Sequence, residues 1–142
     1  MEYEINSDTL AIIPYQKGKS KILELNDEYI VDLTPYQVIE NSCSYYGSSL
    51  NGRIKGSKNI IGSYYKLPVI VSERNNIVFF PLKKGNCWWW INFNSVKYFE
   101  KTSNGVLVSF KNELKKYISV SYTIFNNQML KCSRLWLVYT TR

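Results

Sequence analysis

The sequence predicts a single α+β domain, residues 1–142, in which helices pack on an antiparallel β-sheet. Most of the chain alternates apolar and polar residues at the period of β-strands, whereas residues 35–46 and 122–137 repeat apolar residues at the period of a helix. Short polar turns connect consecutive strands, which favours antiparallel pairing. A chain of 142 residues has the usual size of one domain and can bury a core of its own.

The predicted sheet consists of an N-terminal hairpin and a C-terminal meander. Strands are expected at residues 9–14, 20–25, 29–33, 69–71, 77–80, 88–100, 106–110 and 114–120. The polar turn at 26–28 closes the hairpin, and the turns at 102–105 and 111–113 separate the last three strands into the meander. Pro14 and Pro81 are expected to end the strands in which they occur.

The helix near residues 35–46 has a complete start signal. Thr34 is a predicted N-cap, Pro35 occupies the first helical position, and Gln37 completes a capping box. Gly47 is suited to end this helix in a left-handed conformation. Its expected apolar face consists of Tyr36, Ile39, Cys43 and Tyr46.

A possible short helix is predicted near residues 49–58, and either this helix is weak or its glycines serve close approach to another backbone. Ser48 or Ser49 can cap such a helix, but Gly52 and Gly56 each cost about 1 kcal/mol in a helix interior. A last helix is predicted near residues 122–137. Its apolar face is expected to contain Phe125, Met129, Cys132 and Trp136.

Charge changes sign along the chain at about residue 40. Residues 1–40 carry eight carboxylates and three lysines, whereas residues 41–142 carry 15 Lys and Arg residues and three glutamates, and the formal net charge is +7. A domain with so much positive charge in one part usually binds a polyanion. The acidic N-terminus has no apolar leader region and no segment approaches a membrane span, so we expect a cytoplasmic protein without a membrane partner.

The composition argues against catalysis. The sequence contains no histidine, which excludes Ser-His and Cys-His nucleophile pairs and the common zinc sites. Cys43, Cys87 and Cys132 are widely spaced and predict free, buried thiols. Glu113 precedes Leu-Lys as in some metal-dependent nucleases, but its place beside Asn112 indicates an exposed turn charge. We expect no enzyme activity, catalytic residue, cofactor or metal site.

Three basic segments are candidates for contact with nucleic acid. Arg53, Lys55 and Lys58 lie among glycine and serine, and small residues let backbone amides approach phosphates that the cations neutralise. A solvated basic loop would show the same pattern. Lys83 and Lys84 precede the tryptophan triplet at 88–90, whose rings are either a stacking platform or parts of the core.

The third basic segment is the C-terminal helix. Its polar side chains include Asn126, Asn127, Gln128, Lys131 and Arg134. Amide side chains can donate to the minor-groove acceptors of A·T pairs, and Lys or Arg can hold phosphates or enter a narrow groove. Polar faces are also the rule on surface helices, so this signal is weak by itself.

A longer pattern identifies the chain with a family. The main block is Ser42-Cys43-x-Tyr45-Tyr46-Gly47-Ser48-Ser49-x-x-Gly52-Arg53-x-x-Gly56-Ser57. Later landmarks are Lys66-x-Pro68-Val69-Ile70-Val71, Phe79-Phe80-Pro81, Cys87, Trp90-Ile91, Val96-Lys97, Val120-Ser121-Tyr122 and Asn127-Gln128. Over nearly its whole length the chain resembles the ComK family, the competence transcription factors of Bacillus, Listeria and staphylococci.

The resemblance implies an activator of competence genes that binds paired A/T-rich boxes through the minor groove, associates with itself on adjacent boxes and bends the DNA. It makes Arg53 a contact to a phosphate or the groove, whereas Asn127 and Gln128 either contact DNA or cap or pack the last helix. Longer relatives carry histidines where Phe93 and Ser95 stand here. They also extend past the position of Arg142 with a segment that a protease adaptor captures, so we do not expect adaptor-controlled degradation.

We therefore predict a regulator of transcription that binds A/T-rich duplex DNA, mainly through the minor groove and the phosphates. We expect it to associate with itself on DNA and with the nucleoid. Its predicted DNA contacts are Arg53, Lys55, Lys58, Lys83, Lys84, Asn127, Gln128, Lys131 and Arg134. Two alternatives stay open: a regulator that binds another protein through its Tyr- and Trp-rich surface, and single-strand binding through the tryptophans.

Overall fold

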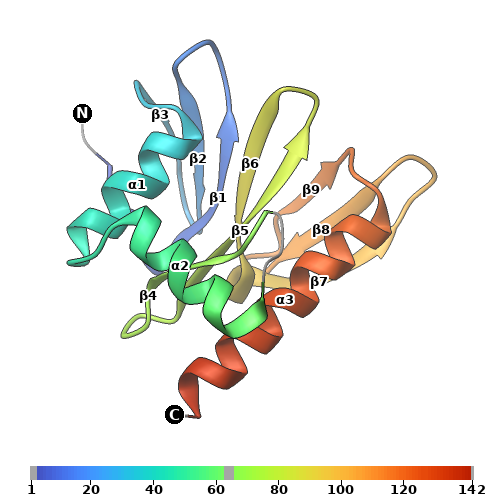
Figure 1. Ribbon diagram of the computed structural model, residues 1–142. Coiled ribbons are helices and arrows are strands. Elements are labelled where there is room, and N and C mark those ends of the chain that lie inside the picture. Colours follow the sequence, from blue (N-terminus) through green and yellow to red (C-terminus); the bar gives the residue numbers. More distant parts are fainter. Residues whose placement is uncertain (1–2, 63–65, 142) are drawn as a thin grey trace.

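The computed structural model describes residues 3–62 and 66–141, which form the predicted α+β domain (Figure 1). The strands are β1 (Thr9–Pro14), β2 (Ser20–Glu24), β3 (Glu28–Val31), β4 (Val69–Ser72), β5 (Ile77–Lys84), β6 (Cys87–Asn92), β7 (Val96–Lys101), β8 (Val106–Phe110) and β9 (Lys115–Ile118). The helices are α1 (Pro35–Tyr45), α2 (Leu50–Ile61) and α3 (Tyr122–Thr140), with a 3-10 turn at Phe93–Ser95.

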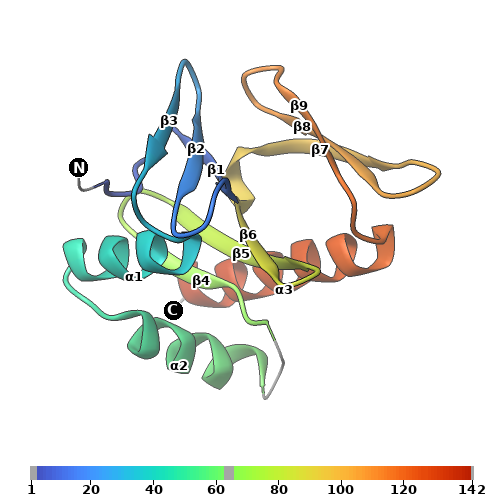
Figure 2. The same cartoon turned by 90° about the horizontal axis from the view of Figure 1, so that it is seen from above.

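The strands form two antiparallel sheets. One sheet has six strands in the order β3-β2-β1-β6-β5-β4, and the other is the meander β7-β8-β9. The predicted hairpin and meander are confirmed, but they belong to different sheets. Helix α1 packs on one face of the larger sheet, while α3 and the meander lie on the other side (Figure 2). Helix α2 contacts the edge strand β4 and both other helices.

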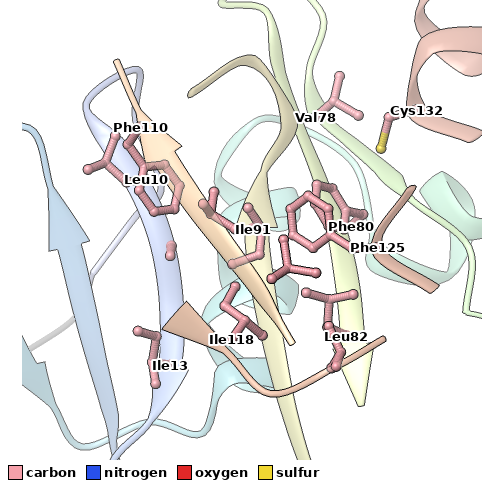
Figure 3. Packing of buried hydrophobic residues seen from close by; sticks show 14 of the residues in the cluster. Leu10, Ile13, Val78, Phe80, Leu82, Ile91, Phe110, Ile118, Phe125 and Cys132 are labelled. Carbon is pink, nitrogen blue, oxygen red and sulfur yellow. The ribbon is translucent and has the colours of Figure 1, made fainter. Parts of the chain in front are cut away.

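Each face of the larger sheet buries its own cluster of apolar side chains. Neighbouring residues of a strand point to opposite faces, so Phe79 packs with α1 while Phe80 packs with α3. Figure 3 shows Phe80 against Phe125 of α3, with ring centroids 5.4 Å apart and planes at 84°. Such an edge-to-face arrangement adds about 0.5–1.5 kcal/mol to the burial of the two rings. The two clusters hold α2 and α3 in fixed positions beside the sheet.

The predicted long strand at 88–100 is wrong, because Asn92 ends it. The side-chain oxygen of Asn92 accepts a hydrogen bond from the backbone N–H of Asn94 at 3.2 Å, which caps the 3-10 turn. Its side-chain nitrogen donates to the carbonyl of Thr9 in β1 at 2.8 Å. The chain therefore leaves the larger sheet at this residue and enters the meander.

Pro81 does not end its strand either, since β5 continues to Lys84. The last pair between β4 and β5 joins Val69 to Phe79, so Pro81 lies beyond the end of β4. Its carbonyl accepts a hydrogen bond from the side-chain nitrogen of Gln128 at 2.6 Å. In an antiparallel strand, the N–H and the carbonyl of one residue point to the same side. The carbonyl of Pro81 points toward Gln128 and not toward β6, so the lack of an N–H at Pro81 removes no bond to β6.

The start of α1 is confirmed in detail. The hydroxyl of Thr34 accepts from the backbone N–H of Gln37 at 3.2 Å, and the side-chain oxygen of Gln37 accepts from the N–H of Thr34 at 2.9 Å. Gly47 follows with a φ of +84°, as expected for the end of this helix. The prediction that Tyr36 belongs to the apolar face is wrong, because Tyr36 is 50% exposed. Val38 belongs to the buried face instead.

Helix α2 is continuous across both of its glycines and begins after the N-cap Ser49, whose hydroxyl accepts from the N–H of Gly52 at 3.0 Å. The prediction that all three thiols are buried is wrong for Cys87, which is exposed near the tip of the β5–β6 hairpin. Cys43 and Cys132 are buried, and this burial raises the pKa of Cys43 to about 11 and that of Cys132 well above its ordinary value.

Candidate nucleic-acid interface

Arg53 forms an ion pair with another residue of the protein. Its side chain is 17% exposed, and one terminal nitrogen lies 3.1 Å from a carboxylate oxygen of Glu73 in the β4–β5 turn. Burial opposes the charge on Glu73, but hydrogen bonds from the backbone and from Arg53 outweigh it and lower the pKa of this carboxyl. The buried Nε atom of Arg53 has no hydrogen-bond partner among the described residues. In this state the guanidinium joins α2 to the β4–β5 turn.

The rest of the basic segment on α2 is exposed. Lys55 and Lys58 lie on its outer surface, so this segment is a solvated helix and not the solvated loop of the alternative interpretation. A Cβ atom added at Gly52 would come within 3.1 Å of the hydroxyl of the N-cap Ser49, whereas one added at Gly56 would meet no described atom within 4 Å. Packing within the chain therefore gives no reason for the glycine at position 56, and the helix surface there is open.

A pocket of about 290 Å³ separates this part of α2 from the last turns of α3. Gly56 and Arg53 form part of one wall, and Leu135 and Tyr139 of α3 form part of the other. The two helices thus border a common hollow on the surface. Backbone atoms of α2 are accessible from it, because glycine leaves them uncovered.

A basic cluster, which we define as Lys66, Lys83 and Lys131, brings together three distant parts of the chain. The ammonium groups of Lys66 and Lys83 each lie 5.8 Å from the ring centroid of Trp88. Partial burial lowers the pKa of Lys131, and the positive charge of Lys66 lowers it further. Lys131 follows Gln128 by about one helical turn, and the side chain of Gln128 donates to the carbonyl of Lys66, so the two segments are neighbours.

Gln128 holds the basic cluster together from inside. Its side-chain nitrogen donates to the carbonyl of Lys66 at 2.9 Å and to that of Pro81 at 2.6 Å. Lys66 adopts a φ of +58°, which is uncommon for a residue with a side chain and is retained here by these contacts. Gln128 is only 3% exposed, so the prediction that it reaches DNA is corrected: its amide packs α3 against β5.

The remaining predicted contacts on α3 lie on its surface. Asn127 and Arg134 are exposed and Lys131 is half-buried. Their spacing of four and then three residues places them along one stripe of the helix. Lys84 lies on the other side of the β5–β6 hairpin from Lys83, with its ammonium group 6.0 Å from the ring centroid of Trp89.

Lys66 is not among the contacts predicted from the sequence. In the sequence it stands alone, and only the fold places it beside Lys83 and Lys131. The tryptophans also separate by role: Trp90 is 6% exposed in one core cluster, and Trp89 is half-buried against the other. Trp88 is half-buried and contacts cations, so it is the member of the triplet that remains available at the surface.

The described residues were also compared with the patterns of a nuclease motif, a metal site and a membrane helix. Glu113 occupies the β8–β9 turn with a φ of +69° and pairs with Lys97 at 2.9 Å, as expected for an exposed turn charge. Within residues 3–62 and 66–141, no three metal-binding side chains gather at one place. None of the described helices has the length and apolar character needed to cross a membrane.

Comparison with known proteins agrees with the resemblance stated above. The sequence model of one family, described as ComK protein, matches residues 1–142. The competence transcription factor of Bacillus subtilis (strain 168) is 33% identical over 142 aligned residues, which cover 95% of this chain and 72% of that protein. No solved structure matches the chain. The chain belongs to the ComK family.

Proposed function

We propose that this protein is a transcriptional regulator of competence that binds A/T-rich duplex DNA across α2, α3 and the basic cluster. The basic cluster is the observation that carries the proposal. The carbonyl of Lys66 is bonded to α3, and its ammonium group shares the ring of Trp88 with Lys83, so positive charge from three segments is concentrated in one region of the chain, as suits binding to a polyanion such as DNA. Membership of the ComK family and the similarity to a competence transcription factor support the same conclusion.

Most of the affinity comes from phosphates. The proposed contacts are Lys55, Lys58, Lys66, Lys83, Lys84, Lys131 and Arg134. Each phosphate that they neutralise releases counterions, so binding weakens steeply as salt is added. Gly56 supports the same geometry, because a helix surface without a side chain lets the sugar–phosphate backbone approach the main chain.

Preference for A/T pairs comes from α3. Asn127 is exposed on the same stripe as Lys131 and Arg134, and its amide can donate to the adenine N3 and thymine O2 acceptors of the minor groove. An arginine such as Arg134 is attracted into the narrow minor groove of A/T-rich DNA. Amide donation and groove width both favour A/T over G/C pairs without reading a unique base order.

Arg53 contributes only after a change of partner. Its guanidinium is bound to Glu73 in the free protein, so a DNA phosphate must replace that carboxylate. The exchange preserves one charge-assisted hydrogen bond and returns Glu73 to solvent. We propose that Arg53 is a second-stage contact, made after the exposed lysines have brought the duplex to α2.

Copies of the protein are proposed to associate when bound to adjacent boxes. Leu130 and Leu137 of α3 are 59% and 64% exposed, and they lie two turns apart on the flank of the stripe that contains Asn127. Apolar side chains at this spacing are suited to packing against an equivalent helix. Association along the DNA would then place neighbouring α3 helices against each other.

The test compares duplexes of equal length that are rich in A/T or in G/C, using fluorescence anisotropy at low salt. We expect tighter binding to the A/T-rich duplex and a loss of affinity in Lys131→Gln, with no comparable loss in Lys101→Gln, an exposed lysine of β7. Absence of duplex binding at low salt would overturn the proposal and favour a regulator that binds another protein. Equal losses of duplex affinity in the two variants would contradict the assignment of duplex binding to the surface that contains Lys131.

A further inference from the structure

A second surface combines aromatic rings with cations at one end of the larger sheet. The tips of the β1–β2 and β5–β6 hairpins lie at this end (Figure 1). Together with the start of α1 they enclose a pocket of about 430 Å³. Its wall contains Tyr15 after β1, Tyr36 of α1 and Trp88 of β6. The volume lies in the range of ordinary ligand pockets.

The rings of this aromatic pocket have no part in the core. Tyr15 and Tyr36 are 49% and 50% exposed, and neither of them nor Trp88 belongs to a buried cluster among the described residues. Three different segments therefore present an aromatic side chain to one hollow. Single exposed aromatic residues need no explanation, but three around one pocket form a stacking surface.

The aromatic pocket is also surrounded by positive charge. All three lysines of the otherwise acidic residues 1–40 lie in or beside the β1–β2 turn, and Lys17 lines the pocket. The ammonium group of Lys21 lies 5.7 Å from the ring centroid of Tyr15, and Lys66 and Lys83 approach the ring of Trp88.

No Asp or Glu residue lines the described wall of the aromatic pocket. The nearby carboxylate of Asp32 is paired with Lys19 at 3.4 Å. The pocket thus complements a flat ring that is attached to negative charge.

We propose that this pocket binds an unpaired nucleobase of single-stranded nucleic acid. The base stacks on the aromatic rings, and Lys17, Lys21 and Lys83 neutralise the adjoining phosphates. A base in a duplex is stacked and paired, and exposes only its edges to a protein. The inference goes beyond the proposed duplex contacts, because it assigns a second kind of nucleic-acid ligand to the aromatic pocket, which shares Lys66 and Lys83 with the proposed duplex surface.

The experiment measures binding of a fluorescently labelled single strand of thymidines at low salt. Tyr36→Ala and Trp88→Ala are expected to weaken binding by about 5- to 150-fold each, as found for loss of one base–aromatic stack. Tyr36→Phe and Trp88→Phe retain a ring and should bind nearly as well as the unaltered protein. The matched control is Tyr98→Ala, which removes a 48% exposed tyrosine from β7 of the meander.

Several outcomes would overturn the inference. These are absence of single-strand binding, equal weakening by Tyr98→Ala, or binding of thymidine monophosphate as tight as that of the strand. Binding of an acidic peptide that is lost in Tyr36→Ala, while strand binding is unchanged, would show a protein ligand instead. Duplex binding separates the two proposals, since Tyr36→Ala should leave it unchanged while Lys131→Gln lowers it.

Discussion

Asn127 and Gln128 are adjacent amides of α3 with opposite environments, and replacing each by alanine separates packing from DNA contact. Gln128 is 3% exposed and its side-chain nitrogen donates to two carbonyls, whereas Asn127 is exposed. Both substitutions put alanine at an interior position of the same helix, so their effects on helix propensity are similar. Differences between the variants therefore report the surroundings of the two side chains.

The expected loss of stability in Gln128→Ala follows from its hydrogen bonds. The buried carbonyl of Pro81 and the partly buried carbonyl of Lys66 lose their donor, and each unpaired buried acceptor costs about 1–3 kcal/mol. The side-chain oxygen of Gln128 has no hydrogen-bond partner among the described residues, so its removal offsets part of that loss. We expect a decrease of about 2–4 kcal/mol in the free energy of unfolding.

Thermal and urea unfolding measure this decrease. For a chain of this size, a loss of about 2–4 kcal/mol lowers Tm by roughly 6–12 °C. Asn127→Ala should leave Tm within about 2 °C and weaken binding to an A/T-rich duplex. If Gln128→Ala unfolds like the unaltered protein but loses duplex affinity, the packing role assigned to Gln128 is wrong.

Three other substitutions and one chemical reaction test separate features. Gly56→Ala should stabilise α2 by about 1 kcal/mol and weaken duplex binding, because a methyl group there is open to solvent but obstructs a DNA backbone; unchanged duplex affinity would show that no close approach occurs. Gly105→Ala should destabilise the meander by about 1–3 kcal/mol in urea unfolding, since its Cβ would lie 2.4 Å from the carbonyl of Ile118. Glu73→Gln should raise duplex affinity about 2- to 5-fold by releasing an arginine, and an unchanged affinity would count against that arginine as a contact. Cys87 alone should react with a thiol reagent in the folded protein, because the other two thiols are buried; a second reacting thiol would contradict the packing of α1 or α3.

Local signals in the sequence predicted local structure well. The capping box at Thr34 and Gln37 involves residues three apart, and the turns of the hairpin and meander depend on a few neighbouring residues. The failure at 88–100 has a nonlocal cause, because Asn92 ends β6 partly by bonding to Thr9, which is 83 residues away. The alternation of the tryptophans between the two faces of the strand was predicted. Only the packing of both faces shows that Trp88 is the ring that remains accessible.

In the candidate interface, too, local patterns were predictable from the sequence, whereas contacts between distant residues were not. Exposed lysines on α2 were selected from the sequence, because small residues and cations alternate there. The partner of Arg53 is Glu73, which is 20 residues away, and nothing in the local pattern predicts that pair. The carbonyl of Lys66 is bonded to Gln128, 62 residues away, and the local sequence does not predict this contact either. Basic segments are therefore predictable from the sequence, whereas the fold determines which cations share a surface.

The most direct test of the duplex interface is the salt dependence of binding to an A/T-rich duplex. The variant that carries both Lys83→Gln and Lys131→Gln is compared with the unaltered protein over a range of salt concentrations. Each lost phosphate contact reduces the slope of log K against log salt by about 0.9. We predict a slope that is less steep by about 1.8 for the double variant, and an unchanged slope would contradict the placement of DNA on the basic cluster.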